Sequence, residues 1–160
     1  MTEARKDILS WDEYFMGIAL ISALRSKDPN TQVGSCIASP ERKVVSIGYN
    51  GMPRFCDESK LTWNKNEGLD SKYLYVCHAE FNAILNSSGG LSLKGCTLYV
   101  TLFPCNECAK AIIQTGIKEV VYISDKYNTQ VSTQASKKLF DLAGVKYRQY
   151  QGRTLSINLK

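Results

Sequence analysis

The chain has 160 residues, which is enough for one domain with a substantial buried core. Hydrophobic residues make up 44% of it, as in ordinary globular proteins, and no apolar run reaches the roughly 18 residues of a membrane span. The net charge of +5 comes from scattered lysines and arginines without a basic block, which argues against a dedicated nucleic-acid-binding arm.

The first ten residues, MTEARKDILS, carry charges and lack the apolar core of a secretory leader. We therefore expect a cytoplasmic protein whose six cysteines are reduced thiols. A helix is predicted next, because Ser10 and Glu13 form the capping-box pattern S-x-x-E. Residues at helical spacing predict one buried face on this helix: Trp11, Tyr14, Phe15, Ile18, Ala19 and Ser22. The helix should end near Pro29, since proline disfavours helix at the residue before it.

Two strands are predicted at residues 33–39 and 43–49, because both stretches are rich in β-formers. The short PERK connection between them is typical of a hairpin. Residues 50–76 then show little periodicity and many polar side chains, so we predict an inserted loop. Long connections of this kind in compact domains are often functional, and a plain surface insertion is the alternative.

Helices and strands alternate over the rest of the chain. A short helix is expected from residue 78, closed by the glycines near residue 90, and a second helix from Pro104 to Gly116. A third helix is expected at residues 133–144, and strands are expected at residues 96–102, 118–124 and 145–150. This alternation predicts an α/β layered sheet with parallel pairs in a single domain covering residues 1–160.

Three residues could hold a metal ion. His78 is the only histidine of the chain, and Cys105 and Cys108 form a C-x-x-C at the start of a predicted helix. Zinc takes nitrogen and sulfur ligands, and a catalytic site uses three of them and keeps the fourth position for water. A redox pair of thiols is one alternative, and a closed structural site with Cys77 as fourth ligand is another.

Glu80 is the acid that these alternatives leave without a role. On a regular helix, residues two apart point to nearly opposite sides, so Glu80 should not be a ligand beside His78. In the first turn of a helix it can still reach the space next to the metal. A carboxylate there could take a proton from a metal-bound water and return it, as a hydrolytic mechanism requires.

The order H-x-E…P-C-x-x-C is the signature of zinc-dependent base deaminases, and His78, Glu80, Pro104, Cys105 and Cys108 match it at every position. The flanking blocks WDEYFM, RSKDPNTQVG, GYNGMP, YVCHAEFNAI, LFPCNECAKAIIQ and SDKY make the chain resemble the deoxycytidylate (dCMP) deaminases over nearly its whole length. The resemblance implies a three-layer α/β/α cytidine-deaminase-like fold with a mixed five-stranded sheet flanked by helices.

The resemblance also implies an activity, namely hydrolysis of dCMP to dUMP and ammonia, which supplies dUMP for dTTP synthesis. One zinc ion would be held by His78, Cys105 and Cys108, its hydroxide would attack C4 of cytosine, and Glu80 would be the catalytic proton carrier. The backbone of Ala79 would bind the base. Members of this family are often homohexamers that dCTP activates and dTTP inhibits.

Further binding residues are expected. By resemblance, Asn50 would bind the sugar and Tyr127 would lie at the substrate pocket, although Asn50 is also a turn residue and Tyr127 could be a rim aromatic. Arg25 and Lys27 are candidates for the 5′-phosphate, because charge-assisted hydrogen bonds suit phosphate, and plain surface charges are the alternative. Gly48, Asn50 and Gly51 resemble part of a nucleotide effector site, although glycines also simply make turns.

Two other functions stay open. A deaminase acting on tRNA or on single-stranded nucleic acid would share the zinc motif, but the sequence shows no basic and aromatic platform for single strands, so no nucleic-acid partner is expected. A catalytically inactive zinc-binding regulatory module would keep the metal ligands, and the intact Glu80 argues against it.

Overall fold

The computed structural model describes residues 2–87 and 92–156. It contains four α-helices and five strands in the described part of the chain. The helices are α1 (Trp11–Ala23), α2 (Ala79–Asn86), α3 (Asn106–Gln114) and α4 (Val131–Ala143), and the strands are β1 (Gly34–Ala38), β2 (Val44–Tyr49), β3 (Thr97–Leu102), β4 (Glu119–Ser124) and β5 (Lys146–Gln149). None of the helices among these residues is both long enough and apolar enough to cross a membrane.

The five strands form one mixed sheet in the order β2-β1-β3-β4-β5. Strand β1 pairs antiparallel with β2 and with β3, whereas β3–β4 and β4–β5 are parallel. The parallel pairs are those whose strands are joined by helices, because a helical crossover returns the chain to the same edge of the sheet. The predicted hairpin, the parallel pairs and the five-stranded mixed sheet are confirmed.

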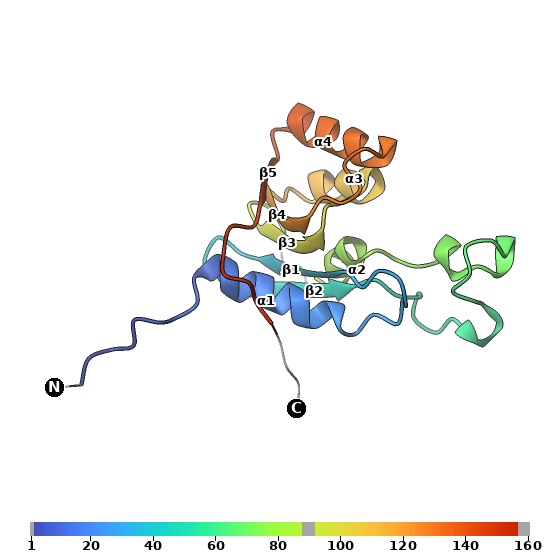
Figure 1. Cartoon of the computed structure of the whole chain (residues 1–160). Coiled ribbons are helices and arrows are strands. Elements are labelled where there is room, and N and C mark those ends of the chain that lie inside the picture. The colour runs from blue at the N-terminus through green and yellow to red at the C-terminus, as the bar shows by residue number, and fades with distance from the viewer. Residues whose placement is uncertain (1, 88–91, 157–160) are drawn as a thin grey trace.

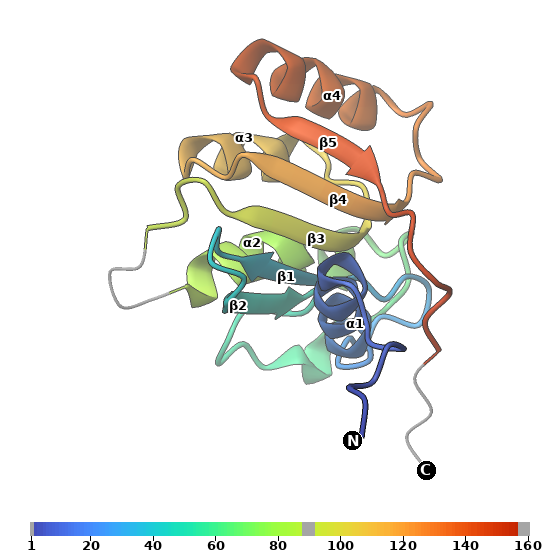
Figure 2. The ribbon, with the colours of Figure 1, turned by 90° about the vertical axis from the view of Figure 1, so that its left-hand side faces the viewer.

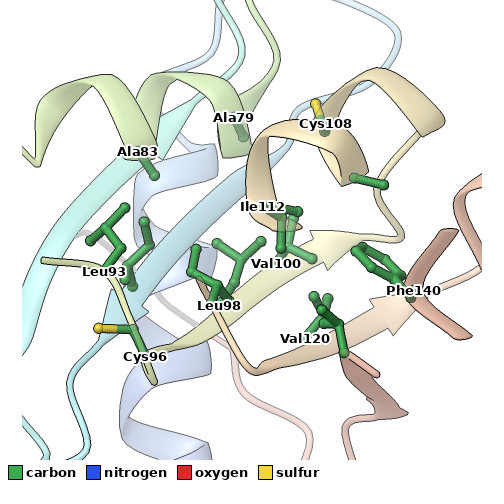
Figure 3. Close-up of a cluster of buried hydrophobic side chains, with 14 of the residues drawn as sticks. Ala79, Ala83, Leu93, Cys96, Leu98, Val100, Cys108, Ile112, Val120 and Phe140 are labelled. Carbon is green, nitrogen blue, oxygen red and sulfur yellow. The ribbon is translucent and has the colours of Figure 1, made fainter. Parts of the chain in front are cut away.

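Helices cover both faces of this sheet (Figures 1 and 2). Helix α1 packs on one face, where its Phe15, Met16 and Ala19 contact Cys36 and Tyr99. Helices α2, α3 and α4 cover the other face, and the larger core lies under them. Figure 3 shows this core, with Ala79 and Ala83 of α2 and Ile112 of α3 facing Leu98 and Val100 of β3. The predicted three-layer α/β/α fold is therefore confirmed.

Helix α1 begins as predicted, but its buried face differs. The Ser10 side chain accepts from the Glu13 N–H, and the Glu13 carboxylate accepts from the Ser10 N–H, so the capping box is complete. Trp11 and Tyr14 were expected in the core and are 47% and 44% exposed. The helix faces the sheet with Met16 as well as Phe15, which turns Trp11 and Tyr14 toward the rim of the interface.

The inserted segment leaves the sheet at the end of β2 and rejoins the rest of the fold at α2. Between these points it projects away from the sheet and its helices (Figure 1). Gly51 and Cys77 form an isolated antiparallel bridge, so the two ends of the segment are tied together. Between them it contains three short 3-10 helices, Glu58–Lys60, Gly68–Asp70 and Lys72–Leu74. The glycines that were predicted to close α2 lie outside the described residues. All six cysteines lie within the described part and are free thiols.

Candidate active site

The starts of two helices bring the three predicted metal ligands together. His78 is the N-cap residue of α2, and Cys105 is the N-cap residue of α3, with Cys108 in the first turn of the same helix. The Nδ1 atom of His78 lies 3.5 Å from the Sγ of Cys105 and 3.5 Å from the Sγ of Cys108. The three ligand atoms lie within 4.8 Å of one another. The structure therefore brings His78, the one histidine of the chain, next to both cysteines of the predicted C-x-x-C.

These atoms fit a zinc ion. With bonds of about 2.3 Å to sulfur and about 2.05 Å to nitrogen, a tetrahedral zinc site has a nitrogen–sulfur edge of about 3.6 Å. Both separations from His78 Nδ1 are 3.5 Å, close to this edge. Among the described residues, Cys77 is not part of the group that could hold a metal. The donor set is thus the three-ligand type that keeps one position for water, and a closed site with Cys77 is not formed.

The three side chains of this group differ in how readily each gives up its proton. Hydrogen bonding to Cys108 and to His78 lowers the pKa of the Cys105 thiol to about 3, despite partial burial. The same Cys105 raises the pKa of His78 to about 9. The Cys105 contact and burial raise the pKa of the Cys108 thiol. A thiolate at a helix N-terminus beside an imidazole is the form that binds metal, since the ligands must give up their protons.

Glu80 lies beside the metal ligands without being one of them. It is 4% exposed, on the first turn of α2, and burial raises its pKa to about 7, against a smaller lowering by His78. A buried carboxyl group with a pKa near neutrality can both accept and release a proton, which is the property of a general acid–base group.

A cavity of about 390 Å³ opens next to Glu80. Its size lies in the range of small-molecule sites. Six of the residues predicted for the site line this cavity together: Asn50, His78, Ala79, Glu80, Cys105 and Tyr127. Cys108 does not line the cavity and is 3% exposed in the first turn of α3 (Figure 3).

Asn50 is held in place by the chain just before β1. Its side-chain Oδ1 accepts from the Val33 N–H at 2.8 Å, and its Nδ2 donates to the Thr31 carbonyl at 2.9 Å. A primary amide has two N–H donors and two acceptor lone pairs, so one of each is left for a ligand. Asn50 is therefore fixed by packing and still has a donor for the cavity that it lines.

Tyr127 lies in the connection between β4 and α4. Hydrogen bonding to Thr31 and the nearby cationic Lys126 lower the pKa of its hydroxyl. The Lys126 ammonium also lies 5.0 Å from the centre of its ring. Tyr127 thus lines the cavity with a hydroxyl disposed to donate, and the residue is 37% exposed.

Arg25 and Lys27 do not reach this cavity. They line a second one, of about 230 Å³, together with Asn50 and Gly51. Lys27 pairs with Glu58 of the inserted segment, and the Arg25 guanidinium lies 6.0 Å from the centre of the Tyr49 ring. The structure therefore separates these two cations from Glu80 and places them with part of the predicted effector site.

Gly48, the third residue predicted for that effector site, lines neither of these cavities. A Cβ atom at Gly48 would lie 2.2 Å from the Ala79 carbonyl oxygen and 2.4 Å from the Ala83 nitrogen. Glycine is thus required here because β2 and α2 approach each other closely.

Several residues of the cavity were missed in the sequence. They come from the turn before β1, the inserted segment and the start of α4: Asp28, Thr31, Lys65, Tyr73, Gln130, Ser132 and Thr133. Asp28 carried a local signal, because aspartate before Pro-Asn is typical of a turn, and its Oδ1 accepts from the backbone of Asn30 and Thr31. Nothing in the sequence indicated that the inserted segment would fold back on this cavity.

Known proteins resemble this chain in sequence and in fold. A family model described as "Cytidine and deoxycytidylate deaminase zinc-binding region" matches residues 9–124. A deoxycytidylate deaminase of Pongo abelii is 56% identical over 148 residues, which cover 91% of this chain and 83% of that protein. A probable deoxycytidylate deaminase of Drosophila melanogaster is 51% identical over 163 residues, covering 96% and 80%.

Among solved structures, the dCMP deaminase from the cyanophage S-TIM5 in complex with dCMP and dUMP superimposes with a TM-score of 0.73 at 24% sequence identity. The match covers 92% of this chain and 100% of that one. At this identity the likeness is one of fold.

Proposed function

The chain belongs to the cytidine and deoxycytidylate deaminase family, and from this membership we propose that it is a dCMP deaminase acting as a single deaminase domain over residues 1–160. It would convert dCMP and water to dUMP and ammonia, and so supply dUMP for dTTP synthesis. The observation that carries the proposal is the His78, Cys105 and Cys108 donor set with buried Glu80 beside it, at a cavity that His78, Glu80 and Cys105 line.

One Zn²⁺ would be held by His78, Cys105 and Cys108. When bound, it supplies a Lewis acid that lowers the pKa of a water molecule toward neutrality. Glu80 would then move two protons as the oxygen of water adds to C4 of cytosine. It gives the first to N3 of the base and the second to the exocyclic amine, which leaves as ammonia.

The other residues of the cavity would bind and orient the nucleotide. The buried backbone at Ala79, next to Glu80, would hold the base against the proton carrier. Asn50 would give its remaining amide N–H to the deoxyribose, and Tyr127 would close the open side of the cavity. Because Asn50 is fixed by Val33 and Thr31, its donor needs no reorganisation when substrate binds.

We also propose regulation and assembly of the family type. dCTP as activator and dTTP as inhibitor would bind the second cavity, where Arg25 and Lys27 offer charge for phosphates and Asn50 and Gly51 line the wall. The expected assembly is a homohexamer in the cytoplasm. No membrane or nucleic-acid partner is part of the proposal.

A substrate panel tests the proposal. Zinc-loaded protein is incubated with dCMP, CMP, deoxycytidine and a cytosine-containing single strand, with and without dCTP or dTTP, and ammonia and deaminated product are measured. We expect turnover of dCMP, raised by dCTP and lowered by dTTP. Turnover of the strand without turnover of dCMP would instead favour the nucleic-acid deaminase.

A variant of Glu80 tests the mechanism. Glu80→Gln should keep one zinc per chain and lower kcat by about 10²- to 10⁴-fold, the usual contribution of a general acid–base group. The control is Glu107→Gln, at the exposed acid in the first turn of α3, which should leave both zinc and kcat unchanged. Loss of zinc from Glu80→Gln would mean that Glu80 is a metal ligand, and the proposed role of Glu80 as proton carrier would be refuted.

A further inference from the structure

We propose that Lys137 of α4 is a positioning residue for substrate binding, because through Asp125 it holds the connection that carries Tyr127 to the cavity. The inference rests on the proposed function and deepens it, since it assigns a role to a residue that does not line the cavity. Lys137 lies one turn after Thr133 on the same face of α4, and Thr133 does line the cavity.

The connection between β4 and α4, residues 125–130, contributes to the cavity. Tyr127 and Gln130 both line it, and Figure 2 shows the connection running from the end of β4 to the start of α4. Within it, the Asn128 N–H and Nδ2 donate to the Asp125 carbonyl at 3.0 and 2.9 Å. The Gln130 N–H donates to the Tyr127 carbonyl at 2.9 Å. These hydrogen bonds make the connection a compact turn, so a shift of Asp125 moves Tyr127 with it.

One ion pair ties this turn to α4. The Lys137 ammonium donates to Asp125 Oδ2 at 2.5 Å, and the Lys137 and Asp125 side chains are only 30% and 18% exposed. This hydrogen bond raises the pKa of Lys137, against a smaller lowering by burial. Asp125 Oδ1 is buried and has no hydrogen-bond partner among residues 2–87 and 92–156. The carboxylate therefore depends on Lys137 for its compensation.

Aromatic rings fix the Lys137 ammonium in this position. It lies 5.2 Å from the centre of the Phe103 ring, and Phe103 lines the cavity. The Tyr122 and Tyr147 rings pack edge-on against Phe103, at centroid distances of 4.8 and 5.6 Å. A cation over an aromatic face in a partly buried site is attracted by the ring. Lys137 thus connects the turn to the aromatic packing beside β4 and β5.

Tyr127 transmits the position of the turn to the rest of the cavity. Its hydroxyl is hydrogen-bonded to Thr31, and the Thr31 carbonyl accepts from the Asn50 side chain at 2.9 Å. Tyr127, Thr31 and Asn50 all line the cavity. Displacement of Tyr127 would therefore disturb the part of the cavity that is proposed to bind the nucleotide. Glu80 and the metal ligands, at the starts of α2 and α3, would keep their places.

Removing the charge of Lys137 should misplace Tyr127. Lys137→Met keeps the length of the side chain, and a thioether packs well against an aromatic ring, so the contact with Phe103 is retained. The Asp125 carboxylate would then be largely buried without a cation, which is strongly unfavourable, so the turn should open to hydrate it.

The measurements separate binding from chemistry in the zinc-loaded enzyme. In Lys137→Met, KM for dCMP should rise and dUMP binding should weaken by about 10- to 100-fold, since a misplacement of about 1 Å can cost this much. The value of kcat should stay within about three-fold of wild type, as expected when binding of substrate and transition state is lost equally. Zinc content should not change.

A double-mutant cycle tests whether Lys137 acts through Tyr127. In protein that already carries Tyr127→Ala, no side chain is left to misplace, so adding Lys137→Met should change dUMP binding by less than about two-fold. A role of Lys137 in folding alone predicts the same loss of dUMP binding in both backgrounds. Binding is measured by calorimetry, with the free energy of unfolding determined alongside.

Three further variants complete the experiment. Lys138→Met removes a charge from the next residue of α4, which is exposed, and should change none of these values. Lys137→Arg keeps a cation beside Asp125 and should bind dUMP within about three-fold of wild type. Asp125→Ala removes the ion pair without leaving a buried carboxylate, so it should show the same rise in KM even if Lys137→Met does not fold.

The outcomes are distinguishable. If the wild type does not turn over dCMP, the proposed function fails and the inference fails with it. If it does, but Lys137→Met binds dUMP as Lys138→Met does, the inference is wrong while the function stands. An equal loss of dUMP binding in the Tyr127→Ala background would also refute it, because Lys137 would then act by another route. Loss of zinc, or a fall in kcat without a rise in KM, would place the effect on the metal ligands and overturn the inference in the same way.

Discussion

Replacing Gly48 by alanine should show whether this glycine is needed for packing or for ligand binding, since the family resemblance implies an effector role for it. The new Cβ would lie 2.2 Å from the Ala79 carbonyl oxygen and 2.4 Å from the Ala83 nitrogen. An ordinary carbon–oxygen contact is about 3.3 Å, so α2 would have to retreat from β2 by about 1 Å. Neither clashing atom belongs to a flexible side chain, so the strain cannot be relieved locally.

The retreat would stretch two hydrogen bonds that hold α2 on the sheet. Ser35 Oγ donates to the Ala79 carbonyl at 2.8 Å, and Ser46 Oγ donates to the Ala83 carbonyl at 2.6 Å. Overpacking costs about 1–3 kcal/mol and each weakened hydrogen bond about 1 kcal/mol. Alanine also lowers the conformational entropy of the unfolded chain, which offsets about 0.5–1 kcal/mol of this destabilisation. The expected destabilisation is about 3 kcal/mol, or a fall in Tm of about 6–12 °C for a chain of this size.

The assay is thermal and urea unfolding of the zinc-loaded protein, with zinc content and dCMP turnover measured alongside. The matched control is Gly51→Ala, where the nearest atoms to the new Cβ belong to the Tyr49 ring, at 3.6 and 3.9 Å, so its stability should stay within about 0.5 kcal/mol. Since His78 is the N-cap residue of α2, the retreat should also lower zinc occupancy. If Gly48→Ala is as stable as Gly51→Ala, the reasoning from close approach is refuted. A stable Gly48→Ala protein that no longer responds to dCTP would favour the effector role.

Three further predictions concern the tail, the metal and the core. The Arg153 guanidinium, with Ser10, lowers the pKa of Glu13 to about 2 from 4.5, so Glu13 adds stability above about pH 4.5 that is lost as the pH falls toward 2. In pH-dependent melting, Arg153→Ala should therefore lower Tm above pH 5 and converge on wild type near pH 2, and a gap independent of pH would contradict this linkage. Chelation should abolish turnover and lower Tm, with Zn²⁺ restoring both; a chelated protein of unchanged Tm would show that the donor set contributes nothing to folding. Phe140→Ala, at a fully buried ring under α4, should lower the free energy of unfolding by about 3–5 kcal/mol in urea titration, whereas Phe55→Ala, at a fully exposed ring, should change it little.

Most of the secondary structure could be predicted, because its signals are local. The capping box at Ser10 fixed the start of α1, and alternation of helices with strands after residue 78 indicated the parallel pairs. Helix α4 begins at Val131, two residues before its predicted start, since Gln130 caps it without a recognisable side-chain bond. Its predicted end is confirmed by Gly144 in the left-handed conformation.

The site was predictable where residue chemistry alone limits the choices. One histidine, a C-x-x-C and an acid two residues after the histidine left few other ways to arrange a zinc site. The placement of Arg25 and Lys27 was not, because charge near a helix end does not say which cavity it faces. Lys65 was missed for a related reason. Its ammonium lies 5.0 Å from the centre of the Tyr73 ring, and Tyr73 is held by Asp28, 45 residues away in the sequence and without a shared pattern.

The metal ligands belong to two parts of the chain that assemble in different ways. His78 follows the β1–β2 hairpin, whose strands are near neighbours in sequence, whereas the two cysteines stand between parallel strands that pair only after whole helical crossovers. His78 and Cys105 lie 27 positions apart in the sequence. If either part of the chain misfolds, the metal is left with only the imidazole or only the two thiols as ligands. Zinc stoichiometry would therefore count the correctly folded molecules in a preparation, independently of any catalytic assay.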